Sequence, residues 1–121
     1  MQDSHIFLAL DPSWTRKQIL LHARHQFLDG AVLHWWHTLL ESGPKTHMTD
    51  DFLWLPFLTL GYLKETCDWS ILSQPEPYRD GPPGTLHDHC DRAFKLVLSR
   101  FSKRGLPLIG EGDWCDGFRA H

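Results

Sequence analysis

Residues 49–63 limit what this chain can fold into more than any other stretch of the sequence. Thr49 or Asp50 is the expected N-cap of a helix, and Asp50 and Asp51 fall where the helix dipole favours negative charge. The apolar residues that follow recur almost all round the helix. This pattern predicts a buried, inner-layer helix in a helical assembly. Pro56 lies either early enough to be tolerated or at a kink.

Length and charge narrow the class of protein. The chain has 121 residues, of which 41% are hydrophobic and six are Trp, so we expect one domain, 1–121, with a substantial core. The net charge is −3 without a Lys/Arg cluster, which argues against nucleic acid and anionic lipid as partners. The longest apolar run, 52–63, is far shorter than the roughly 20 residues of a membrane span. Without a signal-peptide pattern at the N-terminus, the expected location is cytoplasmic.

Two amphipathic helices are predicted on either side of this central helix. The first covers Thr15 to Leu28, with Thr15 in capping-box spacing and Gly30 as its stop, after an extended or turn segment over 3–11. A short helical turn is expected over 67–72, and a proline-rich loop over 74–84.

The last main helix begins at Thr85, which stands in capping-box spacing with Asp88. Gly105 is placed to end it. The residues expected on its core face are Cys90, Phe94, Val97 and Phe101. The predicted fold class is therefore all-α, with three to four main helices and long loops.

The adjacent pair Trp35 and Trp36 is unusual. On a helix, neighbouring side chains point about 100° apart. Either both rings are buried, in a region packed on two sides, or one of them faces a ligand.

The stretch Gly110 to Gly117 packs three carboxylates, one indole and three glycines into eight residues. Glycine lets the backbone come close to a ligand, indole offers a flat apolar face, and carboxylates bind hydroxyls or transfer a proton. This composition fits a sugar-binding loop. It also fits an ordinary surface turn with one buried Trp.

Histidines and cysteines give no convergent pattern. Nine histidines include pairs at i, i+3, such as His22 with His25 and His34 with His37, but no arrangement supplies the three or four ligands of a zinc site. Three cysteines without a CxxC pair suggest neither a disulfide framework nor a cysteine metal site. We expect no metal and no cofactor.

Taken in order, several motifs together resemble one family. They are His25-Gln26-Phe27, Gly30, Val32, His34-Trp35-Trp36-His37, Asp50-Asp51-Phe52-Leu53-Trp54-Leu55-Pro56, Gly84-Thr85-Leu86, His89-Cys90, Gly105-Leu106-Pro107-Leu108-Ile109-Gly110 and Gly112-Asp113-Trp114-Cys115-Asp116-Gly117. The series resembles the catalytic domain of the cellobiose and chitobiose phosphorylases, glycoside hydrolase family 94, which includes the phosphorylase part of cyclic β-1,2-glucan synthases. The resemblance covers about residues 10 to 118.

This resemblance implies an (α/α)6 barrel that cleaves a β-linked disaccharide with inorganic phosphate and inverts the anomeric centre. It implies that Asp116 is the general acid, that Trp114 lines the sugar site, and that Asp50 and Asp51 bind sugar hydroxyls. Phosphate is then the nucleophile and co-substrate, so one proton donor suffices and no carboxylate base is needed to activate water.

The sequence also departs from the family pattern. Cys115 stands where the family has Asn, and Ser42, Lys45 and His47 stand where arginines are usual. Lysine keeps the charge but not the bidentate fork of arginine. We nevertheless expect Lys45 and Trp36 to contact the substrate.

Two functional hypotheses stay open at this point. In the first, the chain is a fragment of a glycoside phosphorylase catalytic domain, inactive by itself, whose partner is the remainder of that domain or a further copy of the chain. Twelve helices need on the order of 200 residues, so 121 residues form an incomplete toroid without the family's downstream phosphate-binding residues. In the second, it is a truncated or degenerate non-catalytic module, a weak sugar binder or a partner of a complementary chain.

Overall fold

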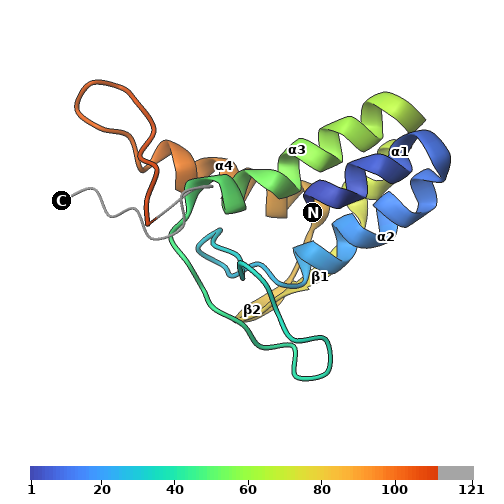
Figure 1. The fold of residues 1–121 in the computed structure, drawn as a ribbon, viewed down its shortest axis with the longest axis horizontal. Coiled ribbons are helices and arrows are strands. Elements are labelled where there is room, and N and C mark those ends of the chain that lie inside the picture. Colours follow the sequence, from blue (N-terminus) through green and yellow to red (C-terminus); the bar gives the residue numbers. More distant parts are fainter. Residues whose placement is uncertain (112–121) are drawn as a thin grey trace.

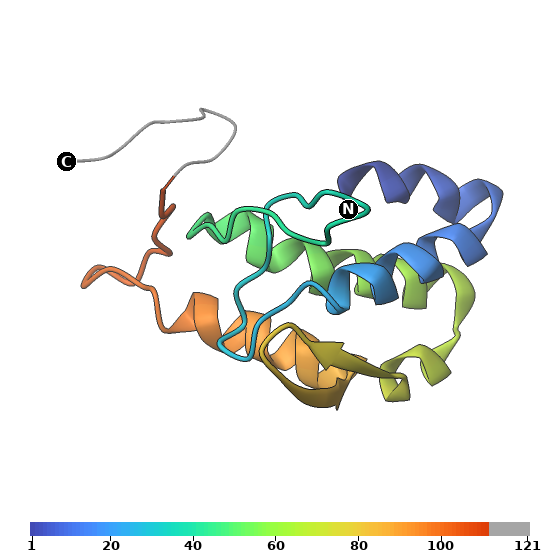
Figure 2. The same ribbon diagram turned by 90° about the horizontal axis from the view of Figure 1, so that it is seen from below.

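A computed structural model describes residues 1–111 of the chain (Figure 1). The elements in this part are η1 (Gln2–Ile6), α1 (Phe7–Leu10), α2 (Pro12–Ala23), α3 (Thr49–Thr66), η2 (Trp69–Ser73), β1 (Pro75–Tyr78), β2 (Gly81–Thr85) and α4 (Leu86–Leu98). The longest helix, α3, packs against both α2 and α4, and the small sheet lies beside α4 (Figure 2). The described part is mostly helical, as predicted, but its two strands correct the all-α class.

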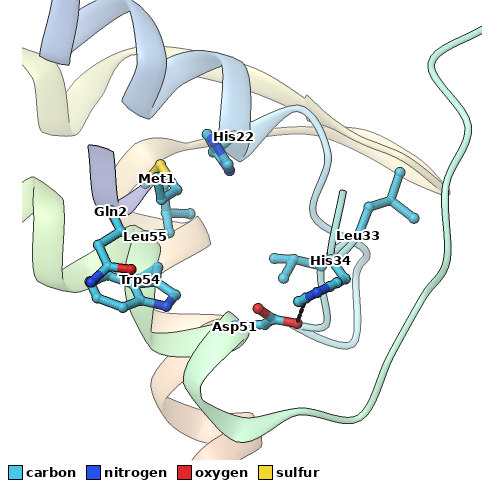
Figure 3. Close-up of a pocket in the computed structure, with 9 residues that line it drawn as sticks. Met1, Gln2, His22, Leu33, His34, Asp51, Trp54 and Leu55 are labelled. Carbon is cyan, nitrogen blue, oxygen red and sulfur yellow. Dashed lines mark hydrogen bonds and ion pairs between the residues drawn. The ribbon is translucent and has the colours of Figure 1, made fainter. Parts of the chain in front are cut away.

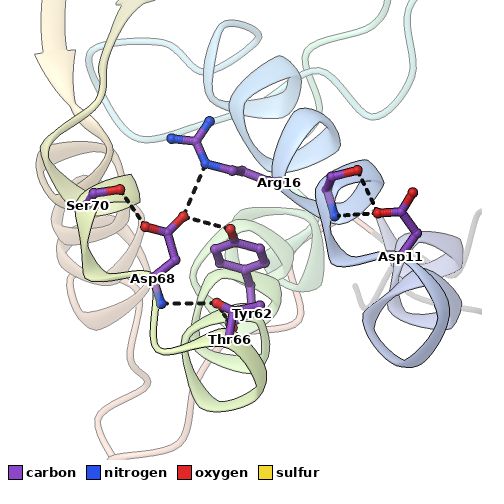
Figure 4. Close-up of polar contacts among 7 residues, drawn as sticks. Asp11, Arg16, Tyr62, Thr66, Asp68 and Ser70 are labelled. Carbon is purple, nitrogen blue, oxygen red and sulfur yellow. Dashed lines mark hydrogen bonds and ion pairs between the residues drawn. The ribbon is translucent and has the colours of Figure 1, made fainter.

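Helix α2 begins three residues earlier and ends five residues earlier than predicted. Its N-cap is Asp11, whose carboxylate accepts a hydrogen bond from the Ser13 backbone at 3.1 Å, and Pro12 occupies the first helical position (Figure 4). Thr15 is not a cap: it is buried, and its hydroxyl donates to the Ser4 carbonyl oxygen at 2.9 Å. That contact holds the preceding segment, which is helical (η1 and α1) rather than extended.

The central helix α3 lies where a helix was predicted, but it begins one or two residues earlier than expected, because its N-cap is Met48 and not Thr49 or Asp50. Its capping differs, because Thr49 is the first helical residue and its backbone N–H donates to the carbonyl oxygen of Ile109 at 3.1 Å. A tertiary contact thus satisfies a donor that we assigned to a side-chain cap. Pro56 lies buried inside the helix. Phe57 and Leu60 are 55% and 51% exposed, so within residues 1–111 the helix is buried on one side and not all round.

The segment predicted as a proline-rich loop forms an antiparallel hairpin, β1 with β2. Glu76 and Tyr78 point inward in alternation along β1. A Cβ atom at Gly84 would lie 2.9 Å from the Tyr78 ring, so glycine lets the two strands close over that ring. Prolines at these strand positions are tolerated because both strands lie at an edge.

Helix α4 starts with the predicted capping box, in which Thr85 and Asp88 exchange hydrogen bonds between side chain and backbone. Its core face is only partly the predicted one. Cys90 and Val97 are buried, whereas Phe94 and Phe101 are exposed. Leu86, His89 and Ala93 complete the buried stripe instead. Gly105 lies in a turn with φ +75°, well beyond the helix end at Leu98.

An ionic and hydrogen-bonded cluster around Asp68 joins α2, α3 and η2 (Figure 4). The Asp68 carboxylate accepts from the Tyr62 hydroxyl at 2.7 Å, from Arg16 Nε at 3.3 Å and from the Ser70 hydroxyl. Hydrogen bonds from Ser70 and Tyr62 hold the pKa of Asp68 below its usual range. The cluster fixes the turn after α3, where Cys67 adopts a left-handed conformation.

A second polar cluster, here named the closed cluster, consists of Gln26, Glu76 and His89. His89 is fully buried, with Nδ1 2.7 Å from Gln26 Oε1 and Nε2 3.0 Å from the Glu76 carbonyl oxygen. Burial lowers the pKa of His89, against the opposing effect of the Glu76 carbonyl. Tyr78 stacks on the imidazole at 3.9 Å, and Arg24 Nε donates to the Glu76 carboxylate at 2.5 Å. The cluster ties the hairpin to α4 and to the chain after α2.

Candidate functional site

A cavity of about 160 Å³ opens beside the first turns of α3 (Figure 3). Its lining residues are Met1, Gln2, His22, Val32, Leu33, His34, Asp51, Trp54 and Leu55. The wall combines apolar side chains with a few polar groups, which is the usual composition of a small-molecule site.

Asp51 points into this cavity and is held by two donors. His34 Nδ1 lies 2.8 Å from Asp51 Oδ2, and the Thr46 hydroxyl donates to the same oxygen at 3.0 Å. The Asp51 side chain is 11% exposed and that of His34 is 39% exposed. We name Asp51, His34 and Thr46 the open cluster. A carboxylate oriented through one oxygen keeps acceptor capacity on the other, which suits it to bind a hydroxyl group.

The structure separates the two predicted sugar-binding aspartates. Asp50 lines a different, mainly apolar groove of about 210 Å³ with Leu53, Trp54 and Phe57. Successive residues of a helix point about 100° apart, so Asp50 and Asp51 cannot face the same side. Trp54 belongs to both linings and forms the wall between them.

The two tryptophans of the pair also take different positions. Trp35 is exposed, whereas Trp36 stacks on His25 with ring centroids 3.8 Å apart. Trp36 also meets the ring of His22 edge-on at 4.7 Å. Because His22 lines the cavity, Trp36 supports the cavity wall from behind. Burial, with help from the Met1 ammonium group and His25, lowers the pKa of His22 to about 2.

Lys45, predicted to contact the substrate, binds within the protein. Its Nζ donates to Asp29 Oδ2 at 2.7 Å and lies 4.3 Å from the centroid of the Phe27 ring. Lys45 also pairs with Leu33 through an isolated β-bridge, which brings its backbone near the residue before His34. The structure thus ties Lys45 to the segment that forms the cavity rim and does not include it in the cavity lining.

The segment that leads to Gly112–Gly117 lies against the start of α3. Besides the Thr49–Ile109 backbone contact, the Thr49 hydroxyl donates to the Leu108 carbonyl oxygen at 2.5 Å. The backbone N–H of His47 donates to Glu111 Oε2 at 3.1 Å. Asp116 and Trp114 lie outside the described residues.

Sequence reasoning missed His34 and Thr46 as partners of Asp51. His34 was noted in a His34/His37 pair and in the motif His34-Trp35-Trp36-His37, but not as a partner of Asp51, and no pattern pointed to Thr46. Their contact with Asp51 depends on how 34–46 folds back, which leaves no periodic trace in a sequence. No group of three or more potential metal ligands gathers within residues 1–111, and no helix there is long and apolar enough to cross a membrane.

Comparisons with known proteins give a consistent result. A family model described as the glycosyl hydrolase 94 superfamily, catalytic domain, matches residues 1–121. The chain is 40% identical over 122 residues to the cellobionic acid phosphorylase of Neurospora crassa, covering 96% of this chain and 15% of that protein. It is 35% identical over 135 residues to the cyclic beta-(1,2)-glucan synthase NdvB of Rhizobium meliloti, covering 97% and 5%. It is 28% identical over 116 residues to the solabiose phosphorylase of Paenibacillus borealis, covering 96% and 15%. The chain therefore spans only a small part of each relative.

Proposed function

The chain belongs to the glycosyl hydrolase 94 superfamily, and we propose that it forms the part of a glycoside phosphorylase catalytic domain that carries the general acid and several sugar-binding residues. The supporting observation is that the segment leading to Asp116 is hydrogen-bonded to the start of α3, next to Asp51 and its cavity. The remainder of an (α/α)6 barrel is its partner in this proposal.

The proposed reaction is inverting phosphorolysis of a β-linked disaccharide or oligosaccharide. An oxygen of inorganic phosphate forms a bond to the anomeric carbon from the face opposite the leaving group. The glycosidic C–O bond breaks, and the carboxylic acid of Asp116 gives its proton to the departing oxygen. The products are a sugar 1-phosphate and a sugar shortened by one unit. Phosphate is a co-substrate, and the reaction needs no cofactor.

Each proposed binding residue has a specific task. Asp51, oriented by His34 and Thr46, binds a sugar hydroxyl in the cavity beside α3. Asp50 binds on the other side of the Trp54 wall, and Trp114 supplies a flat face for a sugar ring. Trp36 acts through His22, and Lys45 contributes positive charge at the rim toward sugar or phosphate.

The test is a chimera in which this chain replaces the matching stretch of the Neurospora crassa cellobionic acid phosphorylase. We expect phosphate-dependent release of a sugar 1-phosphate, and a loss of about 10³-fold in kcat with Asp116→Asn, because general acid catalysis contributes roughly 10²–10⁴-fold. Asp91→Asn, on the outer side of α4, is the matched control and should retain activity. An Asp116→Asn chimera as fast as its parent would refute the assignment.

The alternative is that the 121-residue chain acts as a non-catalytic module that binds sugar weakly or pairs with a complementary chain. The exposed Phe57 and Leu60 on α3 favour it, because they offer an apolar surface for a partner. Here the isolated chain should show no phosphorolysis while its amide resonances near Asp51 shift on titration with disaccharide. Turnover by the isolated chain that Asp116→Asn abolishes would exclude this alternative.

A further inference from the structure

Both backbone groups of His47 are bound by side chains from the segment after α4. Arg100 Nη2 donates to the His47 carbonyl oxygen at 2.9 Å, and the His47 N–H donates to Glu111 Oε2 at 3.1 Å. The partners lie 53 and 64 positions away in sequence. We name Arg100, Glu111 and the His47 peptide the clasp. Figure 1 shows the segment after α4 returning to the start of α3.

Gly110 makes this close approach possible. It has φ +87°, and a Cβ atom there would lie 1.9 Å from the His47 carbonyl oxygen and 2.8 Å from Arg100 Nη2. Any other residue would push the two segments apart and strain the backbone. Glycine is therefore required by the geometry of the clasp and not only by the turn.

Arg100 is braced by the core. Its guanidinium lies 5.3 Å from the centroid of the Phe52 ring, and Phe52 is fully buried in α3. The Leu108 N–H donates to the Arg100 carbonyl oxygen at 2.9 Å, which also fixes the start of the segment that returns toward α3. Arg100 is thus anchored to the core through Phe52 and to the returning segment through Leu108.

The two side-chain bonds of the clasp are exposed to solvent. Exposed bonds of that kind contribute little to stability. Their main consequence is geometric, because they set the separation between residue 47, four residues before Asp51, and residue 111, five residues before Asp116. A displacement of about 1 Å between catalytic and binding groups can cost on the order of 10²-fold in rate.

We propose that Arg100 and Glu111 are positioning residues, which hold the stretch carrying the general acid against the helix start carrying the sugar-binding aspartates by binding the two backbone groups of His47. The positioning role rests on the proposed function, whereas the clasp itself does not. Neither residue contacts the reacting atoms in this proposal; both act through the placement of Asp116.

The clasp is tested first on the full 121-residue chain by amide hydrogen exchange. Glu111→Ala should raise the exchange rate of the His47 amide about fivefold, because its acceptor is lost. Glu111→Gln should keep the protection, since the side-chain amide oxygen also accepts a hydrogen bond. Glu65→Ala, which removes an exposed carboxylate at the other end of α3, is the control. An unchanged His47 exchange rate in Glu111→Ala would overturn the clasp.

The positioning role is tested by kinetics in the chimera. Arg100→Ala and Glu111→Ala should each lower kcat about tenfold or more and leave KM within threefold, because Asp50 and Asp51 still bind the sugar while the acid is misplaced. Arg100→Lys and Glu111→Gln should recover most of kcat, and Lys103→Ala should have no effect. A purely structural role would instead lower the melting temperature and the fraction of active molecules and leave kcat per active molecule unchanged.

The outcomes separate the two proposals. Loss of His47 protection together with an unchanged kcat would overturn the positioning role and leave the proposed function standing. A chimera without phosphorolysis, in which Asp116→Asn changes nothing, would overturn the proposed function and the positioning role with it. The exchange measurement on the isolated chain would still decide whether the clasp exists.

Discussion

The closed and open clusters use similar groups in opposite ways. In the closed cluster the imidazole of His89 meets the Gln26 amide and the Glu76 carbonyl oxygen, and both His89 and Gln26 are fully buried. In the open cluster the imidazole of His34 meets the Asp51 carboxylate at the edge of a cavity. Each brings together segments that lie far apart in the sequence.

The two clusters differ in whether their hydrogen-bonding groups are all used inside the protein. Gln26 Nε2 donates to the His89 and Gly30 carbonyl oxygens, so the hydrogen-bonding groups of its amide are all used inside the protein. Asp51 receives both of its described hydrogen bonds on one oxygen and lies beside open space. A saturated, buried cluster holds the fold, whereas an oriented and partly open one is suited to recognition.

Removing the buried imidazole should have the largest effect on folding. We expect His89→Ala to lower the free energy of unfolding by about 3 kcal/mol, because it leaves a cavity and orphans buried polar groups. Urea denaturation of the chain measures this. His87→Ala, on the exposed side of the same helix, should change it by less than about 0.5 kcal/mol. If His89→Ala does not fold, the milder His89→Gln should show a smaller loss of unfolding free energy. A His89 variant that loses no more stability than His87→Ala would contradict the contrast between the two clusters.

Acid should destabilise the chain through His22, the half-buried histidine of the cavity wall. The pKa of His22 is lowered to about 2 in the folded state, so below the unfolded value near 6.5 only the unfolded chain takes up a proton there. Stability is therefore lost as pH falls from about 6.5, by at most about 1.4 kcal/mol per pH unit. Between pH 7 and 5 this amounts to about 2 kcal/mol.

Unfolding curves at several pH values test this prediction. His22→Gln should remove that part of the pH dependence, whereas His34→Gln in the open cluster should retain it. A His22→Gln chain with the same acid sensitivity as the parent would show that the histidine of the wall is not the cause.

Neutralising the open cluster should affect function more than folding. Asp51→Asn should cost about 1 kcal/mol of stability, because one amide oxygen still accepts a hydrogen bond. The same substitution in the chimera should lower kcat/KM at least tenfold. Thermal unfolding and initial rates measure the two effects, with Asp91→Asn as control. A stability loss as large as that of His89→Ala would mean that the open cluster is structural.

The smallest effect on stability is expected for Lys45, near the rim of the cavity. Lys45 and Asp29 form an exposed ion pair, with side chains 36% and 54% exposed. Exposed pairs of this kind contribute little, so Lys45→Ala should change the free energy of unfolding by about 0.5 kcal/mol and less at high salt. A loss above about 2 kcal/mol, or one insensitive to salt, would mean that Lys45 holds the fold as the closed cluster does.

Local signals accounted for the parts that were predicted well. The capping box of Thr85 and Asp88 needs only four consecutive residues, so it was readable from the sequence and is present. The hairpin was missed because its four prolines read as a loop, although buried Tyr78 and a close-fitting Gly84 hold both strands together. The N-cap of α2 was misplaced because Thr15 stands in capping-box spacing, and Asp11 was assigned to an extended or turn segment. In the structure Thr15 is buried and its hydroxyl donates to the Ser4 carbonyl oxygen, while Asp11 caps the helix.

The sequence by itself determined the central helix, the helix at Thr85, the family and the identity of the candidate acid and binding residues, because periodicity, caps and ordered motifs are written in neighbouring residues. Only the tertiary structure decided which of them meet. In the folded chain the side chain of Asp51 lines a cavity, and that of Asp50 lines a separate groove. Asp51 is hydrogen-bonded to His34 and Thr46, and the segment before Gly112 lies against the start of α3. These contacts join residues that are far apart along the chain, and they form only when the packing of the core brings their elements together.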